Sequence, residues 1–144
     1  MRLSSLADYA IAMMSAIARH CGGARLNAAQ VSEETGIPLP TVQKLVSKLS
    51  AAGLLRSVRG VGGGFQLARP AAAVTLTEII EAIEGPIAMT ACAEEGKHDC
   101  ALEGSCKVQR PMGMVNELVR GALSGVSLSN LANNPTVQNV TVQA

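Results

Sequence analysis

Apolar residues recur at helical spacing over the first third of the chain, and they predict a set of short helices. The first stripe runs from residue 3 to about residue 20, where Gly22-Gly23 ends the pattern. A second, shorter helix is expected over residues 28–35, with Asn27 as its cap and Gly36 as its stop. The first stripe consists of Leu3, Leu6, Ala10, Met13, Met14 and Ile17.

A third helix is predicted after the tight connection 37–40 and ends near Gly53. Pro40 suits its first turn, because the missing N–H of proline is not needed there. Val42, Leu45, Val46 and Leu49 form its apolar stripe, and Thr41, Gln43, Lys44, Ser47 and Lys48 lie off that stripe. A short helix, a tight turn and a helix with one polar face are typical of a helix-turn-helix.

Two strands are predicted directly after this third helix, over residues 54–58 and 64–68. They are joined by residues 59–63, a glycine-rich hairpin tip that carries the guanidinium of Arg59. Glycine-rich loops also bind phosphates in nucleotide-binding enzymes, but those loops lead from a strand into a helix. The pattern therefore predicts the wing of a winged helix and excludes a nucleotide site.

The second half of the chain predicts two further helices separated by a loop. Thr75 and Glu78 have the spacing of a capping box at the start of a helix that ends at Gly85. A long amphipathic helix is expected from Pro111 to about Ser124, and so little chain remains to cover its stripe that a dimer interface is favoured. Its stripe is Met114, Val115, Leu118, Val119, Ala122 and Leu123, after which 126–128 is expected to dock only briefly.

The predicted fold is mainly α with a small β-wing. Residues 1–70 form a winged helix-turn-helix, residues 71–132 hold a cysteine loop and the dimerisation helix, and residues 133–144 form a disordered tail. With 48% hydrophobic residues the chain can bury a core, which must be aliphatic because Tyr9 and Phe65 are the only aromatic residues. No apolar run is long enough to span a membrane, and no secretory signal is visible, so a cytoplasmic protein is expected.

The balance of charge also changes near residue 70, at the predicted boundary of the winged helix-turn-helix. Residues 1–70 carry eight Lys and Arg against three acids, a net +5, and residues 71–144 carry four against eight, a net −4. A basic half favours contact with nucleic acid. No Ser/His/Asp or general-base constellation supports catalysis, so an enzyme is not expected.

Three cysteines lie close together in the acidic stretch ACAEEGKHDCALEGSC, at Cys92, Cys100 and Cys106. In a cytoplasmic protein such a group indicates metal binding or redox sensing more often than structural disulfides. Thiolate ligands suit zinc and iron–sulfur clusters about equally, and a thiol–disulfide switch is a third possibility. Cys21, alone at the end of the first predicted helix, is expected to take no part.

At this point the chain resembles the Rrf2 family of bacterial winged-helix regulators, which includes the IscR and NsrR proteins. The resemblance extends to about residue 132 and rests on RLSSLADYAI, GIPLPTVQKLVSKLSAAGLL, SVRGVGGGFQLAR and VTLTEIIEAIEGPI. The phrase IEGPIAMTAC and the later VSLSNL are most similar to regulators of SUF-type iron–sulfur assembly. The resemblance implies a homodimer with an iron–sulfur cluster, 2Fe–2S or 4Fe–4S, that represses cluster assembly genes.

The resemblance leaves the fourth cluster ligand open. Some relatives use a histidine at the position that is Gln109 here, and others use an acid of the partner subunit at the position of Asp8. Asp8 is therefore our candidate, and the local alternatives are His98, Asp99 and Glu103. A nitric-oxide-sensing cluster repressor and a zinc-stabilised constitutive DNA-binding protein remain as alternative functions.

For DNA binding, the third predicted helix is expected to enter the major groove. Gln43 and Thr41 would meet base edges there, while Lys44 and Lys48 neutralise phosphates. Arg59 at the tip of the wing would enter the adjacent minor groove, where arginine recognises a narrow, A·T-rich groove.

Overall fold

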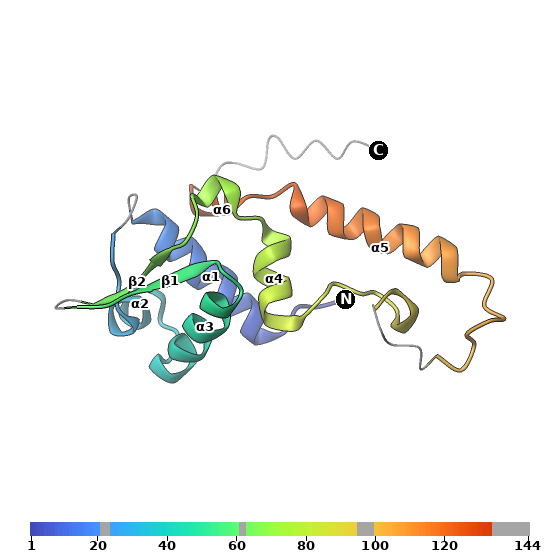
Figure 1. Ribbon diagram of the computed structural model, residues 1–144, viewed down its shortest axis with the longest axis horizontal. Helices are drawn as coiled ribbons and strands as arrows, with labels where there is room; N and C mark the ends of the chain where they lie inside the picture. The colour runs from blue at the N-terminus through green and yellow to red at the C-terminus, as the bar shows by residue number, and fades with distance from the viewer. Residues whose placement is uncertain (21–23, 61–62, 95–99, 134–144) are drawn as a thin grey trace.

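The computed structural model describes residues 1–20, 24–60, 63–94 and 100–133. Figure 1 shows an elongated molecule in which a body of packed helices carries a β-hairpin at one end, and helix α5 extends away from the other. The predicted fold class, mainly helical with a small two-stranded wing, is confirmed. None of the helices in the described ranges is long and apolar enough to cross a membrane.

Helix α1 (Ser5–Arg19) is the centre of the body, packed against α2, α3, α4 and α6. It begins later than predicted because Ser4 caps it, accepting a hydrogen bond from the Ala7 backbone at 3.1 Å. Leu3, expected in the buried stripe, therefore lies outside the helix and is 41% exposed. Ala10, Met13, Met14 and Ile17 are buried as predicted, and Leu6 is half-buried against the core.

Helices α2 (Ala28–Thr35) and α3 (Leu39–Ala51) form the predicted helix-turn-helix. Asn27 caps α2 in a capping box with Gln30, and Gly36 closes the helix with φ of 76°, a left-handed conformation that favours glycine. Two hydroxyls hold the turn: Ser32 donates to the carbonyl of Ile37 at 2.6 Å, and Thr35 accepts from the Ile37 N–H at 3.2 Å. This turn sets the direction in which α3 leaves.

The wing consists of β1 (Leu55–Val58) and β2 (Gly64–Leu67), antiparallel in the register Leu55↔Leu67 to Val58↔Gly64. A contact that the sequence pattern does not predict extends this sheet: Leu26 pairs with Phe65 through backbone hydrogen bonds of 3.0 and 2.8 Å. At Gly64 the two backbones come so close that a Cβ atom would lie 2.3 Å from the Leu26 carbonyl oxygen. Glycine is therefore required at this position, and the wing is fixed to the segment before α2.

A short 3-10 turn, η1 (Ala71–Ala73), leads to helix α4 (Leu76–Glu84), which begins with the predicted capping box of Thr75 and Glu78. The segment expected only to dock briefly is in fact helix α6 (Leu128–Ala132), with its own capping box between Ser127 and Asn130. Leu128 is completely buried, and α6 packs against α1 and η1. Helix α6 thus closes the core of the body.

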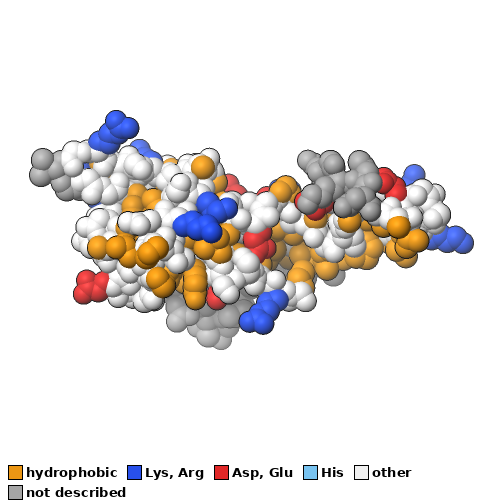
Figure 2. Space-filling model, turned by 90° about the horizontal axis from the view of Figure 1, so that it is seen from below, with side chains coloured by type: hydrophobic (Ala, Val, Ile, Leu, Met, Phe, Trp, Pro, Cys, Tyr) orange, Lys and Arg blue, Asp and Glu red, His pale blue; other side chains and the backbone are white. Residues whose placement is uncertain are grey.

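Helix α5 (Gln109–Ser124) begins two residues before Pro111, because proline is tolerated in the first turn of a helix. The predicted stripe divides into two faces. Val119 and Leu123 are half-buried towards α4, while Met114, Val115 and Leu118 are 65%, 38% and 67% exposed. We call the exposed set, Met114, Val115 and Leu118, the outer stripe. Figure 2 shows hydrophobic side chains gathered along the arm to which α5 belongs.

Candidate functional site

The exposed face of α3 carries the polar residues that the sequence analysis selected. Val42, Leu45 and Leu49 are buried and hold the helix in the body, which leaves Gln43 and Lys44 exposed on the other side. Thr41 is half-buried. Pro38 at the N-cap supplies no side-chain hydrogen bond, so the first turn of α3 has no side-chain cap. A helix start of this kind is suited to contact with a phosphate group.

Arg59 lies exposed at the end of β1, where the chain enters the tip of the wing. The sequence has no Asp or Glu between Glu34 and Glu78, a stretch that includes α3 and the whole wing. Lys44 and Arg59 therefore lie in a stretch of the sequence that contains no carboxylate side chain. This gap in the acidic residues is a stronger signal for an anionic partner than the net charge of the first half.

The three cysteines of the loop lie on the segment that joins α4 to α5. Cys92 is in the short 3-10 turn η2 (Ala91–Ala93), and Cys100 and Cys106 follow in the connection to α5. All three thiols are free and half-buried, and the Cys92 sulfur lies 3.1 Å from the hydroxyl oxygen of Thr90. Figure 1 places this segment beside α5, at the end of the molecule farthest from the wing.

The donor types suit an iron–sulfur cluster or zinc, because both prefer thiolate ligands. Within the described ranges, however, no three Cys, His, Asp or Glu side chains are gathered closely enough to hold a metal. Asp8 is exposed on the first turn of α1, Glu103 is exposed in the loop, and Gln109 begins α5. His98, Asp99 and Cys21 lie outside the described residues.

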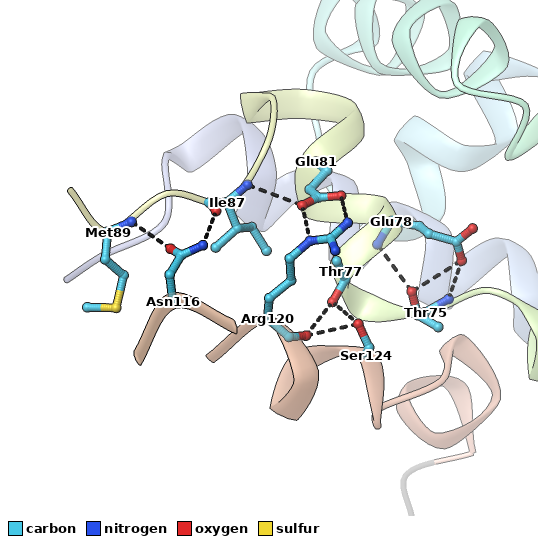
Figure 3. A network of polar contacts seen from close by, with 9 residues as sticks. All are labelled: Thr75, Thr77, Glu78, Glu81, Ile87, Met89, Asn116, Arg120 and Ser124. Atoms are coloured by element: carbon cyan, nitrogen blue, oxygen red, sulfur yellow. Dashed lines mark hydrogen bonds and ion pairs between the residues drawn. The ribbon is translucent and has the colours of Figure 1, made fainter. Parts of the chain in front are cut away.

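Polar contacts that involve α4 and α5 hold Ile87 and Met89, at the start of the cysteine segment (Figure 3). Glu81 accepts two hydrogen bonds from the Arg120 guanidinium, Nε to Oε1 at 2.8 Å and Nη2 to Oε2 at 3.1 Å. Its Oε1 also accepts from the Ile87 N–H at 3.2 Å. The hydrogen bonds from Arg120 lower the pKa of the Glu81 carboxyl, so the ion pair persists at neutral pH.

Two further side chains, Thr77 and Asn116, take part in this interface, and the hydrophobic pattern predicted neither role. The Thr77 hydroxyl lies 2.8 Å from that of Ser124 and 3.1 Å from the Arg120 carbonyl oxygen. The side-chain amide of Asn116 contacts the backbone of both Ile87 and Met89. The available signal was a polar residue, Asn116, that lies three positions before the inward-facing Val119 and therefore on the same face of an amphipathic helix.

Comparisons with known proteins agree with this architecture. A family model described as an iron-dependent transcriptional regulator, Rrf2, matches residues 3–134. The HTH-type transcriptional regulator IscR of Photorhabdus laumondii is 34% identical over 140 residues, covering 97% of this chain and 84% of that protein. IscR of Yersinia pseudotuberculosis is 32% identical over the same length and coverage.

Solved structures share the fold over nearly the whole chain. CymR, the global cysteine regulator of B. subtilis, has a TM-score of 0.75 at 25% identity, covering 94% of this chain and 99% of that one. IscR of T. potens has a TM-score of 0.69 at 22% identity, covering 96% of this chain and 94% of that one.

Proposed function

The chain belongs to the Rrf2 family of transcriptional regulators, and on that premise we propose that it binds DNA as a homodimer under the control of an iron–sulfur cluster. Membership of this family also agrees with the expectation that the protein is not an enzyme. The observation that carries the proposal is that three free, half-buried thiols lie on the one segment that joins α4 to α5.

The proposed cluster ligands are Cys92, Cys100 and Cys106, with Asp8 of the partner subunit as the fourth. A carboxylate ligand is harder than thiolate and suits a cluster that is easily lost. Asp8 is exposed and therefore available to a second subunit. The cluster type, 2Fe–2S or 4Fe–4S, is left to measurement. Because the relatives at 32–34% identity are IscR proteins, we propose that the regulated genes are those of iron–sulfur assembly and that the protein represses them.

The proposed DNA contacts come from α3 and the wing. Gln43 and Thr41 face base edges in the major groove, Lys44 neutralises a phosphate, and Arg59 enters the minor groove. The exposure of Gln43, Lys44 and Arg59 supports this assignment. A twofold dimer would require two half-sites related by approximate symmetry.

The outer stripe of α5 is the proposed dimer surface. Three large apolar side chains within about two turns of an exposed helix are costly to leave in water, and a second copy of the same helix would cover them. Dimerisation through α5 would place the turn η2 of each cysteine segment next to a helix of the interface, because η2 packs against its own α5.

Anaerobic purification followed by an absorption spectrum and counts of iron and sulfide tests cluster binding. Gel shifts with cluster-loaded and cluster-free protein on the region upstream of its own operon test the switch. Equal affinity in both states would contradict regulation by the cluster. A colourless protein with one zinc per chain would favour the zinc-stabilised alternative, and release by nitric oxide but not by iron starvation would favour a nitric-oxide sensor.

A further inference from the structure

The segment that leads to Cys92 is attached to α5 through its own backbone. Nδ2 of Asn116 donates to the Ile87 carbonyl oxygen at 3.1 Å, and Oδ1 accepts from the Met89 N–H at 2.9 Å (Figure 3). Since an N–H can only donate and a carbonyl can only accept, these partners permit one orientation of the amide. Asn116 therefore binds alternate residues of the segment, as a neighbouring β-strand would.

Burial makes this contact unusual for α5. Among the residues of α5, all of which the structure describes, Asn116 is the buried one, at 5% exposure. A leucine of similar size would bury more apolar area, but it would leave the Ile87 carbonyl and the Met89 N–H without these partners. A buried amide with both ends satisfied fixes one particular placement of the segment, which an apolar contact would not do.

A second set of contacts restrains the same segment from the other side. The Ile87 N–H donates to Glu81 of α4, and Glu81 in turn is held by Arg120 of α5. Thr90 and Ala91 are the residues that separate this anchored stretch from Cys92, and the turn η2 that contains Cys92 packs against α5. The position of the Cys92 sulfur is therefore set from α5.

We propose that Asn116 is a positioning residue that couples Cys92 to α5, so that the ligation state of this thiol and the placement of the dimerisation helix change together. This inference deepens and rests on the proposed function, in which Cys92 is a cluster ligand and α5 joins two subunits. Coupling of this kind is reciprocal: if α5 restrains Cys92, then a change in the ligation of Cys92 must also alter the placement of α5.

The test begins with the cluster-free full-length protein, in which Asn116→Asp is the informative substitution. Aspartate keeps the size of asparagine and an acceptor for the Met89 N–H, but it places a carboxylate oxygen against the Ile87 carbonyl oxygen. We expect amide hydrogen exchange in peptides containing Met89 to accelerate by about tenfold or more, and alkylation of Cys92 by N-ethylmaleimide to accelerate similarly. Alkylation of Cys106 and exchange in α3 should not change.

Glu117→Gln is the matched control, because Glu117 is the next residue of α5 and is exposed. General loosening of the protein would accelerate alkylation of both thiols, so the ratio of the Cys92 rate to the Cys106 rate separates positioning from lost stability. Asn116→Leu is the second variant, and it should raise the same ratio without adding a charge. An unchanged ratio in both Asn116 variants would overturn the proposal.

Reciprocity supplies the second measurement. Alkylation of Cys92 in the wild-type protein should accelerate amide exchange in α5 peptides around Asn116, and this response should be absent from Asn116→Asp. The same variants are then loaded anaerobically, where Asn116→Asp should lose iron to a chelator severalfold faster than wild type. A wild-type protein that binds no iron would contradict the proposed function, while the cluster-free measurements would still decide the role of Asn116.

Discussion

Arg120 of α5 and Glu81 of α4 form a bidentate ion pair, with Nε–Oε1 and Nη2–Oε2 distances of 2.8 and 3.1 Å. This pair joins the winged-helix body to the arm that carries the outer stripe. Glu81 is the less exposed partner, with 22% of its side chain accessible against 46% for Arg120. Solvent screens the guanidinium, so the pair contributes at most about 1 kcal/mol to folding.

The lowered pKa of Glu81 predicts how this contribution depends on pH. Because the carboxyl pKa in the folded protein lies below its usual value of 4.5, the stabilisation is present above that value and is lost as pH falls through the folded pKa. In Glu81→Gln the free energy of unfolding should therefore depend less on pH in the acid range than it does in the wild type. Urea unfolding at a series of pH values checks this, and identical slopes for variant and wild type would contradict it.

Lys44 and Gln43 should affect DNA binding in different ways. Lys44→Ala removes the proposed phosphate contact, so it should weaken binding to all sequences and reduce the slope of log K against log salt by about one. Gln43→Ala should relax preference at one base pair and weaken specific binding by about 1–3 kcal/mol. Fluorescence anisotropy over a salt series measures both effects, and Lys107→Ala, an exposed cation far from α3 in sequence, is the control.

Leu118→Glu should shift the protein from dimer to monomer. Leu118 is 67% exposed in the single chain, so a charge there leaves the fold intact but would be buried in an interface built on the outer stripe. Analytical ultracentrifugation over a concentration series measures the shift. Leu39→Glu, at a residue 40% exposed on the winged-helix body, should leave the association state unchanged.

Gly64→Ala should damage the wing. The added Cβ would meet the Leu26 carbonyl oxygen at 2.3 Å, and a backbone atom cannot move aside as a flexible side chain can. We expect a loss of about 1–3 kcal/mol of stability and weaker DNA binding. Gly113→Ala is the control, since nothing lies within 4 Å of its Cβ position; thermal unfolding that is equal for the two variants would refute the prediction.

Leu128→Ala should destabilise the body strongly although it lies near the end of the described chain. Leu128 has no exposed surface and fills the core next to α1, so the change should reduce stability by about 2–5 kcal/mol. Chemical unfolding measures this loss. Leu102→Ala, at a side chain that is 62% exposed, should change stability little.

Local signals predicted most of the elements correctly. Asn27 and Thr75 cap helices as expected, and Val42, Leu45 and Leu49 are buried where the periodicity placed them. These features depend on residues within one or two turns of each other, and so they are visible in a sequence. Helix α6 was missed because its five residues are too few to show a periodic pattern, and a helix this short depends on the burial of Leu128 in the core as well as on its own cap.

The sequence by itself determined the winged helix-turn-helix, the candidate DNA contacts and the presence of three thiols in one loop. The tertiary structure alone decided three other features: the pairing of Leu26 with Phe65, the division of the α5 stripe into two faces, and the contact of Asn116 with Ile87 and Met89. The two contacts join residues far apart in the chain, and the division of the stripe depends on the packing of α4 against one face of α5. Their partners are selected by how the helices pack, because periodicity shows that a face is apolar but not which element covers it.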